Sequence, residues 1–216
     1  MQKLSIYHVS SFLKKTTEAD LLGLEAQLKM APTLREKELR LVNSNLPRRL
    51  SAILIILFME DGVLKTLMMK RSSNLNHHAG QISFPGGQVD KDDRSPWETA
   101  IRETEEETGI DRNGITFLTK LSDLFIPPSN FNVNVMVGSL KELPKLTPNS
   151  EEVDDLIKVP ISFFLEEEHI QNMNFEVGED RMLEAPAYLF NEHIIWGASA
   201  MMISELVEIL KKMPAE

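Results

Sequence analysis

The chain has 216 residues, a net charge of −10 and no cysteine. The length is enough for one sizeable hydrophobic core, and 42% apolar with 26% charged residues is ordinary for a globular protein. The acidic charge argues against binding to a nucleic-acid backbone, which needs a basic stripe. The missing cysteines exclude disulfides, thiolate catalysis and a thiolate metal site.

The ends of the chain and its apolar runs give expectations about location. The first residues contain no charged segment followed by an apolar one, so we expect no secretory signal. The longest apolar run, Ala52–Met59, is too short to span a bilayer. The last residues, Met213–Glu216, match no address signal such as a peroxisomal tripeptide. We therefore expect a cytoplasmic protein with no membrane partner.

The first part of the chain is predicted to be helical, and two strands follow it. Thr17–Met30 carries leucines at helical spacing. Ala52–Met59 is an isoleucine-rich run typical of a buried strand, and Leu64–Lys70 continues as a second strand. The turn signal Asp61-Gly62 between these strands predicts a hairpin.

The rest of the chain mixes loops, helices and strands. The expected elements are a loop over Arg71–Gly87, a helix over Pro96–Thr108, strands over Gly114–Leu121 and Phe131–Val137, a loop over Lys141–Ser150, a short helix after Val159-Pro160, a strand over Pro186–Phe190 and an amphipathic helix over Ala198–Lys212. Because strands and helices intermix, we predict one α/β or α+β domain over residues 46–216, preceded by a helical extension over residues 1–45.

Three carboxylates share one face of the helix predicted over Pro96–Thr108. Glu103, Glu106 and Glu107 fall at positions i, i+3 and i+4, which lie on one side of an α-helix. They repel each other at neutral pH, and a hard divalent cation with oxygen ligands would relieve the repulsion. Trp97 lies roughly opposite, so the same helix can also pack on a core. The alternative is a solvated acidic face that holds no ligand.

This acidic helix and the glycines before it resemble a known signature. Gly86-Gly87 followed by Arg102-Glu103-x-x-Glu106-Glu107-x-Gly109 resembles the Nudix box, the loop–helix–loop motif of Nudix hydrolases. The segment departs from the motif at Asp93, where a glutamate is expected, at Thr104, which fills an apolar position, and by one inserted residue before Arg102. The insertion with Asp93 is similar to the coenzyme A branch of the family. With Phe84-Pro85 also in place, the box is favoured over a solvated face.

The resemblance implies a fold and a chemistry. The fold would be the Nudix α/β/α sandwich, in which a mixed sheet lies between helices. The chemistry would be hydrolysis of a diphosphate by a water that bound Mg²⁺ or Mn²⁺ makes nucleophilic. The implied metal ligands are Glu103, Glu106 and Glu107, with Arg102 orienting them. Glu152 or one of the helix glutamates, such as Glu106, would act as catalytic base, and the sequence leaves this open.

A second motif lies upstream. The segment Leu67–Gly87 resembles the one that marks coenzyme A pyrophosphatases within the Nudix group. The matching positions are Arg71, Ser72, Leu75, His78, Gly80, Phe84, Pro85, Gly86 and Gly87. The resemblance implies substrate binding by Arg71, Ser72, His78, Gly86 and Gly87. The alternative is a structural lid on a Nudix fold that takes another substrate.

The same segment departs from the coenzyme A motif at Met68, Met69 and Asn76. Asn76 matters most, because it replaces an arginine that could pair with a phosphate. His77 could partly compensate, although an unperturbed histidine is mostly neutral at pH 7. This departure bears on affinity for a 3′-phosphorylated substrate more than on the diphosphate chemistry.

Three further segments look like the coenzyme A branch. Leu124–Phe131 resembles its proline loop, Glu151-Glu152-Val153 its acidic-valine element, and Ile194–Ala200 its Trp-Gly helix start. In the second segment Glu152 is either a further metal ligand or base, or a surface carboxylate. In the third, core packing of Trp196 is favoured over substrate stacking. The resemblance covers about residues 48–210.

We expect a metal-dependent hydrolase that splits coenzyme A or its derivatives into 3′,5′-ADP and (acyl-)4′-phosphopantetheine. One alternative is a Nudix hydrolase of another nucleoside diphosphate derivative, such as ADP-ribose or a nucleotide sugar. The other is a catalytically dead Nudix-fold binding module, against which the intact acidic cluster argues. The expected partner is a small nucleotide and not a nucleic acid, and a homodimer is left open.

Overall fold

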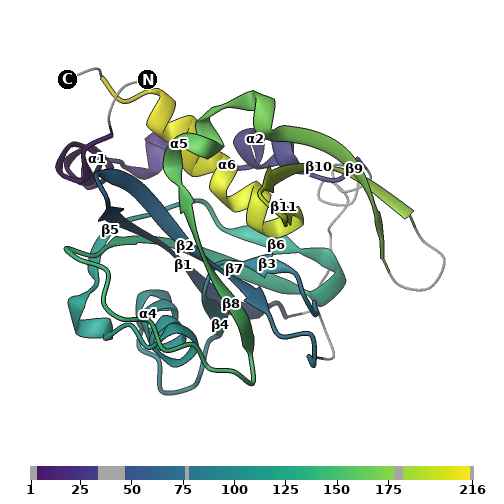
Figure 1. Ribbon diagram of the computed structural model, residues 1–216, viewed down its shortest axis with the longest axis horizontal. Helices are drawn as coiled ribbons and strands as arrows, with labels where there is room; N and C mark the ends of the chain where they lie inside the picture. The colour runs from purple at the N-terminus through teal and green to yellow at the C-terminus, as the bar shows by residue number, and fades with distance from the viewer. Residues whose placement is uncertain (1–3, 34–46, 76–77, 178–181, 215–216) are drawn as a thin grey trace.

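The central element of the structure is a mixed sheet (Figure 1). The computed structural model describes residues 4–33, 47–75, 78–177 and 182–214. The strands of this sheet are β1 (Arg49–Glu60), β2 (Val63–Arg71), β3 (Ile82–Ser83), β4 (Gly86–Gln88), β5 (Thr116–Lys120), β6 (Leu124–Ile126), β7 (Phe131–Ser139) and β8 (Val153–Pro160). The order is β3-β2-β1-β7-β5, with β4 paired to β1, β6 to β7 and β8 to β2. β1 and β7 run parallel, and the other pairs are antiparallel.

The first two strands form the expected hairpin. Glu60 pairs with Val63 at the end of the ladder. The turn residues Asp61 and Gly62 have φ angles of 52° and 73°. A tight two-residue hairpin turn requires this left-handed conformation at both central positions. The Asp-Gly pair therefore fixes the register of the two central strands.

Helices cover both faces of the sheet. Along β1, Ile55 packs in the core cluster that includes α6 (Gly197–Lys211), whereas its neighbour Ile56 packs in the cluster that includes α4 (Pro96–Thr108). The two helices lie on opposite sides of the sheet in Figure 1. A strand covered on both faces reads as a continuous apolar run, as this one does. The layered arrangement confirms the predicted Nudix-type α/β fold class.

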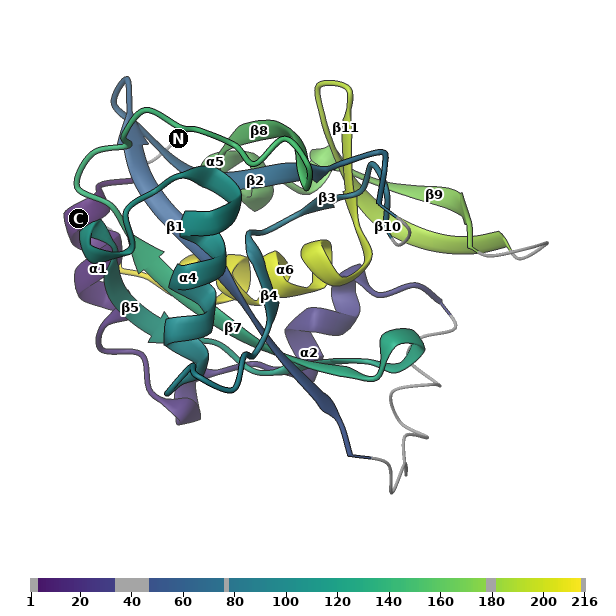
Figure 2. The ribbon, with the colours of Figure 1, turned by 90° about the horizontal axis from the view of Figure 1, so that it is seen from below.

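A second, three-stranded sheet projects from the body (Figure 2). Its strands are β9 (Ile170–Glu176), β10 (Met182–Phe190) and β11 (His193–Trp196). The sequence predicted only the Pro186–Phe190 part of β10 and missed β9 and β11. In the central sheet it missed β6 and β8, and the expected loop over Arg71–Gly87 was wrong in part, because this segment contains β3 and the start of β4, which are too short to show a strand pattern. The Trp196 ring stacks on Phe175 with a centroid distance of 3.8 Å. Trp196 is half-buried and belongs to neither core cluster, so the core-packing role expected for it stays a prediction.

Short helical pieces occupy the connections. α5 (Ile161–Leu165) follows Val159-Pro160 as expected, but these two residues themselves close β8. The 3₁₀ turns are η3 (Arg112–Gly114), η4 (Pro127–Ser129) and η5 (Glu167–His169). None of the described helices combines the length and the apolar content that a membrane span requires.

The N-terminal segment is helical, as expected, but it is broken into short pieces. They are α1 (Ile6–Leu13), η1 (Glu18–Asp20), α2 (Leu24–Gln27) and η2 (Leu28–Met30). Both α2 and η2 pack against α6, and Glu205 of α6 accepts a hydrogen bond from the backbone N–H of Gly23 at 2.8 Å. The predicted boundary between residues 45 and 46 lies outside the described residues and stays a prediction.

Candidate active site

The acidic helix α4 begins and ends where its sequence signals predict. The Ser95 hydroxyl accepts a hydrogen bond from the backbone N–H of Glu98 at 3.2 Å, and Pro96 takes the first helical position. Gly109 ends the helix with a φ of 76°, a left-handed cap that glycine adopts at little cost. A Cβ at Gly109 would also collide with Thr147. These local features fix the bounds of the helix that carries the three glutamates.

The loop before β8 is attached to the end of this helix. The backbone N–H of Thr147 donates to Thr108 O at 2.9 Å, and that of Asn149 donates to Glu107 O at 3.1 Å. Asn149 O in turn accepts from Glu152 N at 3.0 Å. The loop therefore satisfies carbonyls that a helix end leaves free. It also holds exposed Glu152 at the C-terminal end of α4.

Arg102 links the acidic side chains on one side of α4. Its Nη2 donates to Asp93 at 2.9 Å, and its Nη1 donates to Glu103 at 2.8 Å and to Glu106 at 3.2 Å. The Arg102 hydrogen bonds hold the pKa of the Asp93 carboxyl well below its usual range. Asp93, which the sequence marked only as a departure from the box, is thus the residue that anchors Arg102. Arg102 in turn fixes two of the three predicted metal ligands.

Glu107 differs from the other two helix glutamates, because it is only 2% exposed. Among the described residues, one hydrogen bond reaches its carboxylate, from the backbone N–H of Gly86 at 2.8 Å. Burial raises the pKa of Glu107 to about 8, with a further rise from the charges of Glu103 and Glu152, while the Gly86 hydrogen bond and the charge of Arg71 oppose the shift. A solvated acidic face does not describe this side chain.

The two glycines of the box are required by close approach. A Cβ at Gly86 would collide with the Ala52 carbonyl and with Ile53 on β1, and the φ of Gly86 is 150°. A Cβ at Gly87 would collide with the carboxylate of Glu103. The absence of side chains thus lets β4 lie between β1 and the acidic helix.

Of the residues predicted in the upstream segment, the structure relates Arg71 to α4, whereas the side chains of Ser72 and His78 form hydrogen bonds within the segment itself. Arg71 lies near enough for its charge to act on Glu107, and its Nε is buried without a hydrogen-bond partner. Ser72 is fully buried, and its hydroxyl accepts from Asn74 N at 3.3 Å. His78 is exposed, and its Nδ1 forms a hydrogen bond with Gln81 at 2.9 Å. Asn76 and His77, on which the 3′-phosphate argument depends, lie outside the described residues.

The three glutamates of α4 offer the type of ligand atom that a hard divalent cation prefers. All of its ligand atoms are carboxylate oxygens, and burial and like-charge repulsion both raise the pKa of Glu103 and Glu107. Glu103 and Glu106 turn toward Arg102 while Glu107 turns toward Gly86. The three α4 carboxylates do not come together as one cluster. Within the described part of the chain, the only group of three or more acidic or histidine residues whose ligand atoms all lie within 4.8 Å of one another is Glu166, Glu168 and His169, between α5 and β9.

Comparison with known proteins identifies the family. The model of the NUDIX domain matches residues 47–184. The chain belongs to the Nudix hydrolase family. It is 32% identical over 174 residues to "Nudix hydrolase 15, mitochondrial" of Arabidopsis thaliana, an alignment that covers 78% of this chain but only 60% of the length of that relative. It is also 32% identical over 163 residues to "Mitochondrial coenzyme A diphosphatase NUDT8" of Mus musculus, covering 74% of this chain and 77% of that protein.

A solved structure supports the same fold. The crystal structure of the Nudix hydrolase RenU from M. smegmatis superimposes with a TM-score of 0.53, covering 77% of this chain and 88% of that one. The sequence identity is 18%, so this likeness concerns the fold. The Nudix α/β fold with its mixed sheet and acidic helix is therefore established from both sequence and structure.

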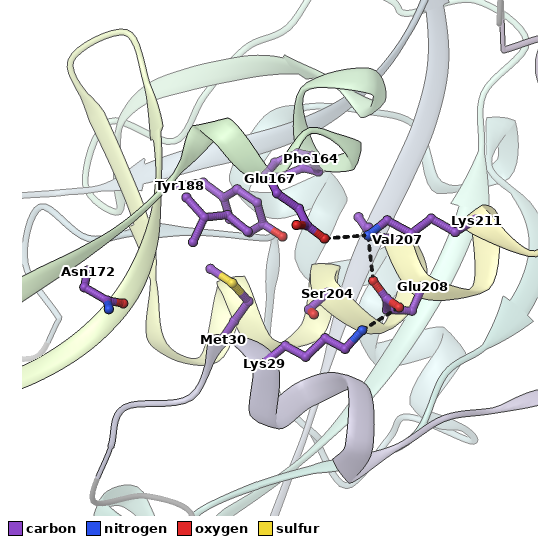
Figure 3. Close-up of a pocket in the computed structure, with 11 residues that line it drawn as sticks. Lys29, Met30, Phe164, Glu167, Asn172, Tyr188, Ser204, Val207, Glu208 and Lys211 are labelled. Carbon is purple, nitrogen blue, oxygen red and sulfur yellow. Dashed lines mark hydrogen bonds and ion pairs between the residues drawn. The ribbon is translucent and has the colours of Figure 1, made fainter. Parts of the chain in front are cut away.

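Figure 3 shows the residues that line a cavity of about 370 Å³. It opens between η2, α5, the small sheet and α6. Its charged groups already pair with one another, because Glu208 bridges Lys29 at 2.6 Å and Lys211 at 2.9 Å. None of the residues predicted to bind metal or substrate lines it. The acidic helix and not this cavity is the candidate active site.

Proposed function

We propose that this chain is a metal-dependent diphosphatase that cleaves coenzyme A or its derivatives into 3′,5′-ADP and (acyl-)4′-phosphopantetheine. The observation that carries the hydrolase assignment is Glu107, a buried carboxylate with one hydrogen bond and two acidic neighbours. Such a group costs stability unless a cation or a proton compensates it. A site that keeps this arrangement is suited to binding a divalent metal.

The residues of the proposed site have three roles, which are metal binding, positioning of the ligands and proton transfer. Glu103, Glu106 and Glu107 would hold Mg²⁺ or Mn²⁺, which when bound neutralises phosphoryl charge and makes a water nucleophilic at neutral pH. Arg102 keeps Glu103 and Glu106 in place through one nitrogen. Glu106, with a 52% exposed side chain, and exposed Glu152 are the two carboxylates that could take the proton from the attacking water.

Coenzyme A is the favoured substrate for two reasons. The Arg71–Gly87 segment matches the coenzyme A motif at nine positions. A relative named as a coenzyme A diphosphatase is 32% identical over most of both chains. The nucleotide substrate is the partner that family membership implies, and a homodimer stays a prediction. The cytoplasmic location also stays a prediction, because both relatives described above are named as mitochondrial proteins.

A substrate panel tests the proposal. Coenzyme A, an acyl-coenzyme A, ADP-ribose and a nucleotide sugar are incubated with Mg²⁺ or Mn²⁺, and the phosphorus-containing products are identified. We expect the highest kcat/KM with a coenzyme A species and complete loss of turnover with a chelator. Faster turnover of ADP-ribose or a nucleotide sugar would replace the coenzyme A assignment. No turnover of any diphosphate would favour the binding module.

A further inference from the structure

Three polar side-chain atoms in the described part of the chain are buried without a hydrogen-bond partner. They are Thr66 Oγ1, Arg71 Nε and Ser83 Oγ. A buried donor without a partner destabilises a folded protein, and native proteins contain few of them. A bound ligand that supplies the missing acceptor is one explanation for such an atom.

Two of these atoms lie on the face of the sheet that carries the acidic helix. Ile82 and Phe84 both pack in the core cluster of α6, so Ser83 between them points to the opposite face, because side chains alternate along a strand. Ser83 pairs with Met69 of β2, and Arg71 is two residues beyond Met69 on the same face. The diagonal neighbours Arg71 and Ser83 are thus within reach of one another.

The effect of the Arg71 charge on Glu107 agrees with this orientation of Arg71. Arg71 lowers the pKa of Glu107, so its guanidinium lies near the acidic centre. Although carboxylates are nearby, no acceptor among the described residues takes the hydrogen of its Nε. Two donors, one cationic and one neutral, therefore face the side of the sheet that carries the acidic helix, and no acceptor among the described residues pairs with them.

Thr66 provides a matched comparison on the same pair of strands. Its neighbours two residues away, Leu64 and Met68, pack in the core cluster of α6, and the adjacent Leu67 packs in the cluster of α4. By alternation the Thr66 hydroxyl faces α6 and not the acidic helix. It has the same missing hydrogen bond as Ser83 but no route to a ligand in the candidate site.

We propose that Ser83 is a substrate-binding residue, whose hydroxyl donates a hydrogen bond to a phosphoryl oxygen of the diphosphate beside Arg71. This inference rests on the proposed diphosphatase function, but not on coenzyme A as the particular substrate. An anion with several acceptor oxygens is the chemical class that satisfies both unpaired donors. Ser83 lies outside the residues that the coenzyme A motif marks for substrate binding, so it adds a contact that the motif does not specify.

The test compares Ser83→Ala with Thr66→Val. Both changes remove an unpaired buried hydroxyl, so neither is expected to lower the free energy of unfolding measured in urea without metal. Only Ser83→Ala is expected to lower kcat/KM, by roughly tenfold, as for loss of one hydrogen bond to a charged group. The loss should be equal for every diphosphate that the wild type hydrolyses, because these substrates share the group that Ser83 contacts.

A binding measurement separates this inference from the substrate assignment. Calorimetric titration with 5′-ADP and Mg²⁺ should give about tenfold weaker affinity in Ser83→Ala and unchanged affinity in Thr66→Val. If the wild type hydrolyses ADP-ribose and not coenzyme A, the substrate proposal fails, while the same Ser83→Ala losses on ADP-ribose and 5′-ADP still support the inference. Unchanged kcat/KM and unchanged 5′-ADP affinity in Ser83→Ala would overturn it, as would equal losses in Thr66→Val.

Discussion

Two glutamates are buried on opposite faces of the central sheet, and their surroundings differ. Glu205 on α6 is 0% exposed and accepts hydrogen bonds from the Ser122 hydroxyl at 2.7 Å, Gly23 N at 2.8 Å, and Gln27 Nε2 and Ser122 N at 3.2 Å. Glu107 on α4 is 2% exposed and accepts one, from Gly86 N.

The difference shows what each carboxylate does. Burying a charge is costly, and hydrogen bonds to the charged form offset the cost. The donors around Glu205 come from the N-terminal segment and from the loop before β6, so they join distant parts of the chain to α6. Around Glu107 the described residues supply one donor, Gly86 N, and two further acids, Glu103 and Glu152. Glu205 is therefore compensated by donors from the chain itself, whereas Glu107, with one described donor, is the carboxylate that we propose as a metal ligand.

The largest expected effect follows from neutralising Glu107. Glu107→Gln keeps the size of the side chain but removes a charge that the proposed metal site needs. We expect kcat to fall on the order of 10²-fold or more, because metal positioning contributes several kcal/mol of transition-state stabilisation. Steady-state kinetics with Mg²⁺ measure this loss, and urea unfolding checks that the fold is intact.

A matched control for this change lies on the same helix. Glu105 pairs with Arg112 at the surface, so Glu105→Gln makes the identical chemical change away from the site. Its kcat should remain within about twofold of the wild type, since exposed pairs contribute little. Equal activity of Glu107→Gln and Glu105→Gln would mean that Glu107 is not part of the active site.

The second effect concerns stability on the other face. Glu205→Gln places an amide NH₂ against donors that a carboxylate satisfies, so a buried hydrogen-bond set is broken. We expect the free energy of unfolding in urea to fall by about 2–3 kcal/mol, with kcat/KM unchanged at 25 °C. As a control on the same helix, Glu208→Gln disturbs only the partly exposed pairs with Lys29 and Lys211 and should cost less than about 1 kcal/mol. If Glu205→Gln has the same free energy of unfolding as the wild type, Glu205 does not stabilise the fold.

The sequence predicted the helix that carries Glu107, but it did not predict the burial of Glu205. The helix was predicted from about Pro96 to Thr108, and the structure gives the same bounds, because Gly109 at its end is a local signal. Glu205 was not recognised as buried, because its partner Gly23 is 182 residues away in the chain. Such a contact leaves no periodic pattern in the sequence.

Strands without an apolar pattern were missed for a related reason. β8 carries Asp154, Asp155 and Lys158, and β9 is mostly polar and mostly exposed, with the adjacent pair Gln171-Asn172 interrupting its alternation. Their pairing with β2 and β10 and not their own composition makes them strands.

Of the site, Ser83 is a residue that the sequence pattern could have indicated. It lies between two apolar residues, and this position predicts that its side chain points to the opposite face. The roles assigned to the site residues stay predictions.

The smallest expected effect is a pH dependence that only the Glu107 face should show. In the metal-free protein the pKa of Glu107 is raised to about 8 from an ordinary value of 4.5, so the folded state holds this proton more tightly than the unfolded state does. The stabilisation from protonation is lost as pH rises from the unfolded pKa through the folded one. Between pH 6 and pH 7 the free energy of unfolding should therefore fall by about 1.4 kcal/mol from this group. Urea unfolding with a chelator, across this interval, measures the slope. The Glu107→Gln variant should show a smaller slope, and the Glu205→Gln control should keep the wild-type slope. Parallel pH profiles for the wild type and Glu107→Gln would contradict the prediction, because they would mean that groups of the chain already compensate the buried carboxylate of α4.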